Sequence, residues 1–246
     1  MKIIKTCKLN QQPVQLIREQ VVLEWQTPGR ALLTLKPHSA EAIPKAGQAV
    51  ALALALDDDP PKLFFSGYVE QVSAKAPGIY TLLAREFSAV LNQRLAVSLR
   101  HCTAKQVLEL ISEQSALQFV LEDAEWTTAL LPRFQHIGGG YMALDMIGVL
   151  WGVPQFCWHQ QSDGRIYVGS WQRSVTGHKH IRLPIEVFKA PTIEGASLPL
   201  IPRLRPGVQI ETQGIRRWVT RVEMHSERMR LTWSTNPWHT HLKAIR

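Results

Sequence analysis

Residues 49–56 read AVALALAL, and after an acidic, proline-containing stretch residues 63–69 read LFFSGYV. Because alternate residues of a strand point to opposite faces, the first stretch would place leucine on one side and alanine on the other. Its short length and its flanks, residues 46–47 and 57–61, favour a strand over a helix. With the apolar run at 79–84, these stretches predict a meander of the kind found in small barrels and sandwiches.

The β pattern extends toward the N-terminus. Short apolar-rich runs occupy residues 14–17, 21–25 and 31–35. The tripeptide Thr27-Pro28-Gly29 between the last two has the composition of a turn. The first 95 residues are therefore expected to be mostly β.

The middle of the chain changes to a helical period. Thr103 and Gln106 have the spacing of a capping box, in which each side chain bonds the backbone N–H of the other residue. A helix is expected to follow, then a strand at 117–121, a second helix at 141–151 and a hairpin formed by 155–159 and 165–171. The predicted order is helix, strand, helix and two strands.

The last segment returns to β structure. Arg205-Pro206-Gly207 offers proline and glycine at the two central positions of a type II turn. Strands are predicted at 208–212, 215–224 and 229–234. Strict alternation in the middle strand would place Trp218, Thr220, Val222 and Met224 on one face, and Arg217, Val219, Arg221 and Glu223 on the other.

These patterns predict an α+β, mainly β protein in which two small β-barrels flank a small α/β domain. The expected boundaries are 1–97 for the N-terminal barrel, 98–172 for the α/β domain and 173–246 for the C-terminal basic barrel. These boundaries assume that each domain is one continuous segment, and they would be wrong if strands from later in the chain belonged to the N-terminal barrel.

Composition and charge narrow the function classes. Of 246 residues, 45% are hydrophobic and 20% charged, which excludes wholesale disorder. The longest apolar run, 49–56, is far shorter than the roughly 20 residues of a membrane helix. The N-terminus has no apolar signal region, so a soluble protein made in a cytoplasm is expected. Residues 173–246 contain 13 basic and 5 acidic residues, a surplus equal to the net charge of +8. This surplus favours either an anionic partner or a solvated basic face.

Motifs for catalysis are missing from the sequence, and no catalytic residue, metal or cofactor is expected. The glycines at 138–140 precede a helix but lack the lysine and hydroxyl residue of a phosphate loop. The aspartates at 57–59 are expected at a solvated hairpin tip rather than in a calcium loop. Histidine pairs at 178/180 and 239/241 leave a metal-dependent enzyme as a weak option. Cys7, Cys102 and Cys157 are expected to be small buried thiols.

Arginines and tryptophans gather near the C-terminus. This combination occurs both on surfaces that bind single-stranded nucleic acid and at protein–protein hot spots. Both interpretations stay open at this point. The residues chosen as interface candidates are Arg205, Arg216, Arg217, Trp218 and Arg221.

Several motifs in order resemble one protein family. The segment 63–69 is similar to an apolar-apolar-Phe-x-Gly-x-Val strand, followed by an Arg- and Leu-containing stretch at 85–91. Segments 103–108, 143–144, 151–154 and 163–169 resemble the family's α/β domain, and 204–208 with 219–225 resemble its second barrel. The family is that of bacteriophage contractile-tail baseplate hub proteins. It includes late control protein D, the Mu-like tail hub and the hub-like half of type VI secretion spike proteins.

The resemblance implies a homotrimeric, non-enzymatic hub. Three subunits with two similar barrels each would form a pseudo-sixfold ring that joins the tail tube to the central spike. It implies as partners a second and third copy of the chain, the tail spike protein and the tail tube or other baseplate proteins, with DNA passing through the channel as a further candidate. It places the protein in the virion tail baseplate, assembled in the host bacterial cytoplasm. The alternative is a nucleic-acid-binding protein that uses the basic C-terminal barrel.

Overall fold

The structure is a computed structural model in which residues 2–38, 43–177 and 180–240 are described, with side chains through residue 238. Contacts between residues divide the chain into two compact units. One, here called the β unit, contains residues 1–87 and 180–237, and the other, called the α/β unit, contains residues 88–179 and 238–246. The mainly β character predicted from the sequence is confirmed.

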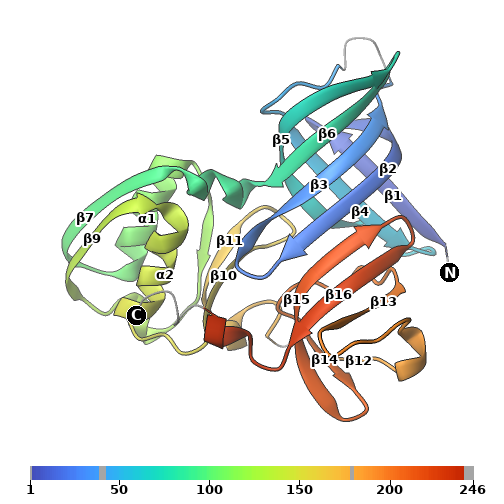
Figure 1. Cartoon of the computed structure of the whole chain (residues 1–246). Helices are drawn as coiled ribbons and strands as arrows, with labels where there is room; N and C mark the ends of the chain where they lie inside the picture. The colour runs from blue at the N-terminus through green and yellow to red at the C-terminus, as the bar shows by residue number, and fades with distance from the viewer. Residues whose placement is uncertain (1, 39–42, 178–179, 241–246) are drawn as a thin grey trace. The chain divides into compact units, whose positions relative to one another are not determined.

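Six N-terminal strands of the β unit pair antiparallel in the order β1-β4-β5-β6-β3-β2 (Figure 1). A short pairing of β1 with β2, from Cys7 opposite Val14 to Leu9 opposite Gln12, closes the circuit of hydrogen-bonded strands. Leu33, Leu52 and Leu82 are fully buried inside it. The strands are β1 (Ile3–Leu9), β2 (Gln12–Glu24), β3 (Thr27–Lys36), β4 (Ala49–Leu56), β5 (Lys62–Ala76) and β6 (Ile79–Glu86).

The C-terminal strands of the β unit continue the same sheet. β15 pairs with β14 and β16, and its residues 221–225 also pair with β2 (Figure 1). Buried side chains of both segments therefore form one hydrophobic core, and the description as two separate barrels is not confirmed. These strands are β12 (His180–Arg182), β13 (Gly195–Pro199), β14 (Gln209–Thr212), β15 (Ile215–His225) and β16 (Arg228–Ser234).

In its described residues, the α/β unit contains two α-helices and two small sheets. Strands β10, β11 and β8 form one sheet, in which β8 runs parallel to β11, while β7 and β9 form an antiparallel ribbon. The predicted order of helices and strands is present, with β7 and β9 added. The elements are β7 (Arg94–Cys102), α1 (Ala104–Ser115), β8 (Phe119–Leu121), β9 (Leu131–Gly139), α2 (Gly140–Leu150), β10 (Phe156–Gln160) and β11 (Ile166–Ser170).

Local sequence signals fix several element ends. The Thr103 side chain accepts from the Gln106 N–H at 3.3 Å and the Gln106 amide accepts from the Thr103 N–H at 2.9 Å, so the predicted capping box is confirmed. Gly207 has a φ of 87°, and the Val208 N–H donates to the Arg205 carbonyl at 3.2 Å, as in a type II turn. Strand β4 has the bounds that its alternation predicts.

Other expectations are wrong. Thr27-Pro28-Gly29 is not a turn, because it begins β3 and the chain reverses just before it, at Trp25 and Gln26. Five strands have no counterpart among the predicted elements: β1, β7, β9, β12 and β13. Most exposed positions of β1 and β7 hold polar or charged residues, such as Lys8 and Arg100, so neither segment forms a continuous apolar run.

The predicted division into three domains, with boundaries after residues 97 and 172, stays a prediction. In the structure, the first contact-based boundary falls at Phe87 and the C-terminal β segment shares a unit with the N-terminal one. Within the described residues, neither α-helix has the length and apolar composition to cross a bilayer.

Candidate interface residues and their surroundings

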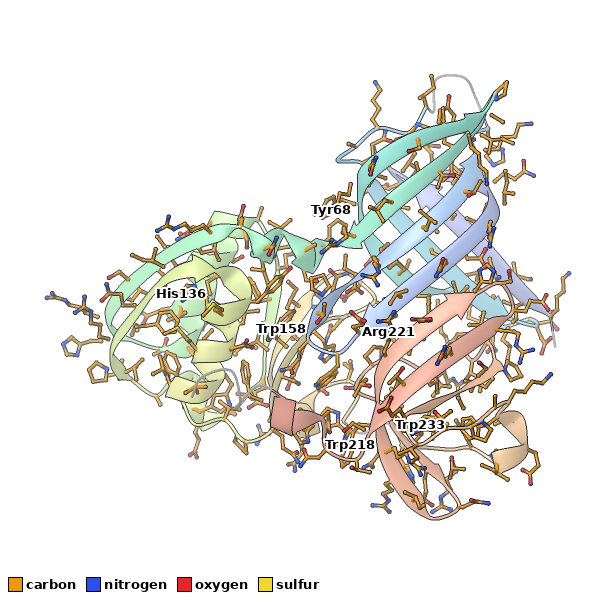
Figure 2. The ribbon with its side chains drawn as sticks, in the orientation of Figure 1. Tyr68, His136, Trp158, Trp218, Arg221 and Trp233 are labelled. Atoms are coloured by element: carbon orange, nitrogen blue, oxygen red, sulfur yellow. The ribbon has the colours of Figure 1, made fainter. Side chains whose placement is uncertain are left out.

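Four of the five predicted interface residues lie on β15, and Figure 2 labels two of them, Trp218 and Arg221. The strict alternation expected for this strand is wrong. Val219 lies opposite Trp233 and Arg221 opposite Thr232, so Thr220 is an extra residue that forms a β-bulge. Because a bulge shifts the following side chains to the other face, Val219 and Val222 both point into the core.

Arg205, the fifth residue, lies inside the β unit. Its Nη1 donates to the Phe64 carbonyl at 2.6 Å, and its guanidinium lies 5.6 Å from the centre of the Phe64 ring. Its Nη2 lies 3.9 Å from the Glu86 carboxylate. Arg205 therefore ties the turn before β14 to strands β5 and β6 of the N-terminal segment.

Glu86 is a buried carboxylate at the end of β6. Its Oε2 accepts from the Gly29 N–H at 2.7 Å. Burial raises the pKa of Glu86 to about 7, although the Arg205 charge and the Gly29 hydrogen bond both act to lower it. Burial in turn lowers the pKa of Arg205, which the Glu86 charge partly offsets. The pair is a structural link between distant segments rather than an exposed contact.

Arg217 and Arg221 are also engaged within the β unit. Arg217 lies over the Trp233 ring, 5.5 Å from its centre. Arg221 pairs with Glu24 of β2 through Nη1 and with Glu223 through Nη2. Trp218, between them, is half-buried. These contacts connect β15 to its neighbours, so the basic surface at this strand is smaller than the sequence suggests.

Arg216 is the exposed member of the set. It is the second residue of β15, after the Gln213-Gly214 turn, and its Nε donates to Glu211 at 3.1 Å. The same carboxylate is 3.4 Å from Arg182 and 3.1 Å from His180. The hydrogen bond from Arg216 and the nearby positive charges lower the pKa of Glu211. Arginine outnumbers carboxylate here, and the side chain of Arg182 is 80% exposed.

A polar network that no sequence motif indicates crosses from β1 to β15. The Lys5 ammonium donates to Glu19 at 2.5 Å and to the Ser226 carbonyl at 2.7 Å. His225 Nδ1 lies 3.3 Å from the Glu19 carbonyl. The partners are up to 221 residues apart in sequence, so no local pattern could have revealed them.

A second missed cluster lies in the α/β unit. Glu122 accepts from the Ser170 N–H at 3.0 Å, from the Ser170 hydroxyl at 2.6 Å and from the Tyr167 hydroxyl at 3.2 Å, and also from the Trp126 ring N–H. Burial acts to raise the pKa of Glu122, but these hydrogen bonds outweigh it and the net effect lowers the pKa. The carboxylate stays charged at neutral pH.

Glu122 borders a groove of about 510 Å³ beside β8. Helix α1 forms one wall, and the short 3-10 turn η3 (Glu125–Thr127) lies on the other side. Leu108, Phe119 and Leu121 supply apolar lining, and Glu109 and Asp123 supply exposed carboxylates. Lys105 is the one basic residue among those lining it.

The remaining polar motifs show no arrangement typical of catalysis. In the described part of the chain, no three His, Cys, Asp or Glu side chains form a metal-binding group. The cysteines are free and buried, and the aspartates at 57–59 form an exposed turn. None of the glycines at 138–140 has a positive φ. At Gly140 the missing side chain allows close packing against Leu91. His178, His241 and the side chain of His239 lie outside the described residues.

Several known structures share the fold of this chain. A 43 kDa tail protein of prophage MuSo2 from Shewanella oneidensis superposes with a TM-score of 0.68 at 9% identity, covering 95% of this chain and 98% of that one. A tail protein from Neisseria meningitidis MC58 gives a TM-score of 0.65 at 8% identity, with 95% and 96% covered. The chain has the fold of phage tail proteins.

Two further comparisons widen this relationship. The E. coli c3393 protein, described as a component of the type VI secretion system, gives a TM-score of 0.62 at 13% identity, covering 92% of this chain and 76% of that one. An uncharacterized 58.7 kDa protein of Haemophilus phage HP1 is 28% identical over 217 residues. The match takes in 88% of this chain but 40% of the phage protein. No family model matches the chain.

Proposed function

We propose that this chain is a structural, non-enzymatic component of a phage or phage-like tail and acts as a baseplate hub. The observation that carries the proposal is the fold, which phage tail proteins share over 95% of the chain. The sequence relative in phage HP1 supports it independently. In this role the protein is assembled in the host bacterial cytoplasm and becomes part of the virion tail.

In the proposed hub, three copies form a ring in which each contributes two barrel-like modules. The circuit of pairings from β1 through β4, β5, β6, β3 and β2 supports the first module. The strands around β15 would supply the second. Such a ring has threefold symmetry with six similar modules, and it would join the tail tube to the central spike. The partners are therefore two further copies, the spike protein, and tube or baseplate proteins.

The role can be tested in a phage or prophage that encodes the chain. A stop codon early in the gene should abolish complete tails in electron micrographs of induced particles, and a plasmid copy should restore them. Particles with complete tails and normal infectivity in the absence of the protein would contradict the proposal.

The alternative, nucleic-acid binding by the basic C-terminal segment, receives less support from the side chains. Arg205, Arg217 and Arg221 are engaged by a carbonyl, an aromatic ring and carboxylates within the β unit. Binding that depends on phosphate contacts weakens steeply with salt. A filter-binding titration with single-stranded DNA at low and moderate salt separates this function from a purely structural role, and the same assay tests contact with DNA in the channel.

A further inference from the structure

The groove beside β8 has the properties of a docking site for a basic segment. The residues that line it include three carboxylates and a single basic residue, Lys105. The carboxylates are those of Glu109, Glu122 and Asp123. Its volume of about 510 Å³ falls within the roughly 300–1,000 Å³ of pockets that hold compact ligands. Leu108, Phe119 and Leu121 add apolar surface. A matching partner would present positive charge next to an apolar side chain.

The position of β8 leaves the groove accessible. In the strand order β10-β11-β8, β8 is the edge strand, and among the described residues it pairs with β11 alone. All three of its residues are half-buried. Exposed strand edges with adjoining apolar surface are sites where another chain can pair or dock.

The β unit carries a segment with the complementary properties. Strands β14 and β15 form a hairpin whose two turn residues, Gln213 and Gly214, both have positive φ, as in a tight type I′ turn. Just after the turn, Ile215 is 49% exposed. Ile215 is thus an exposed apolar side chain at the tip of this hairpin.

Positive charge lies on the other face of the same hairpin, because adjacent residues of a strand point to opposite faces. Arg216 and Arg182 both contact Glu211, which can neutralise only one of them. Their side chains are 62% and 80% exposed. This arginine face, defined as Arg182 and Arg216, therefore has a net positive charge. The groove beside β8 has the opposite property, a surplus of negative charge.

We propose that the hairpin tip of one copy, with Ile215 and the arginine face, docks into the groove beside β8 of a second copy. The inference rests on the proposed trimer and specifies its subunit contact. The two surfaces differ, so the contact is heterologous, and such contacts generate a closed ring when the rotation between copies closes. Arg216, on one face of the inserted hairpin tip, pairs across the interface with Glu109 or Asp123, while Ile215, on the other face, covers the apolar lining.

The test reverses the groove charges in the full chain with Glu109→Lys and Asp123→Lys. Both side chains are exposed, so the fold should persist, which circular dichroism checks. Sedimentation velocity should show association at least tenfold weaker than in the wild type, because like charges would face each other across the contact. Adding Arg182→Glu and Arg216→Glu to the same chain should restore association, because the reversed charges then match.

The matched control is Arg100→Glu with Arg133→Glu, which makes a charge change of equal size and opposite sign on exposed residues of the β7–β9 ribbon. It should associate like the wild type. A wild-type trimer that tolerates the groove reversal would overturn this contact and leave the proposed hub standing. A wild-type monomer at all concentrations would overturn both. Loss of association in every variant, control included, would also overturn the specific contact.

Discussion

Gly67, in the LFFSGYV stretch, should be irreplaceable for a steric reason that can be measured. A Cβ atom built at Gly67 would lie 1.9 Å from the Arg85 carbonyl oxygen and 2.7 Å from its carbon. Ordinary van der Waals contact begins at 3.4 Å. Gly67 lies opposite Glu86 in the β5–β6 pairing, so the obstacle is backbone of the neighbouring strand and cannot rotate away.

The change Gly67→Ala therefore requires the two strands to move apart locally by about 1.5 Å, the difference between 1.9 and 3.4 Å. Such a displacement breaks two or three ladder hydrogen bonds, each contributing about 1 kcal/mol net. Overpacking in a well-packed region typically costs a similar 1–3 kcal/mol. The expected loss in the free energy of unfolding is about 2–3 kcal/mol.

Urea unfolding followed by tryptophan fluorescence measures this loss. The matched control is Gly139→Ala, because a Cβ atom at Gly139 meets nothing within 4 Å and its φ of −65° suits any residue. The control should change the free energy of unfolding by less than about 0.5 kcal/mol. If Gly67→Ala were as stable as the wild type, the close approach of β5 and β6 would be wrong.

Three further predictions concern buried and capping groups. Glu86 has a folded pKa of about 7, above its ordinary 4.5, so its contribution to stability is full below about pH 4.5 and is lost as pH rises through 7. The unfolding free energy of the wild type relative to Glu86→Gln should therefore fall by roughly 3 kcal/mol between about pH 4 and pH 8, and a pH-independent difference would refute this. Thr103→Ala should cost about 1 kcal/mol because the cap of α1 is lost, whereas Thr103→Ser should cost much less; equal losses in thermal melts would contradict the cap. Burial raises the pKa of Cys7 to about 12, and all three cysteines are buried, so an aromatic disulfide reagent should label none in the native protein and three in urea; rapid native labelling would contradict their burial.

The sequence predicted those elements best whose structure depends on residues that are neighbours in the chain. The alternation at 49–56 identified β4, the Thr103 and Gln106 pair identified the start of α1, and Pro206-Gly207 identified a turn. Each of these depends on interactions within a few residues. The bulge at Thr220 was not predictable in this way, because it is defined by the partner strand β16.

The candidate site was harder to predict because its partners are distant in sequence. The arginine-rich composition near the C-terminus predicted Arg205 and Arg221 as interface residues on the surface. Their contacts, Phe64 and Glu24, come from the N-terminal segment and are known only once β2 and β15 pair. The same limit applies to Glu122 and its partner Ser170, 48 residues later. Charge composition predicted a basic segment but not which charges are already neutralised.

The central claim, that the protein forms a trimeric hub, is tested most directly by its mass in solution. Light scattering after size exclusion, over a range of concentrations at moderate salt, should give about three times the chain mass of 27.8 kDa. A mass of one chain at every concentration would contradict the claim.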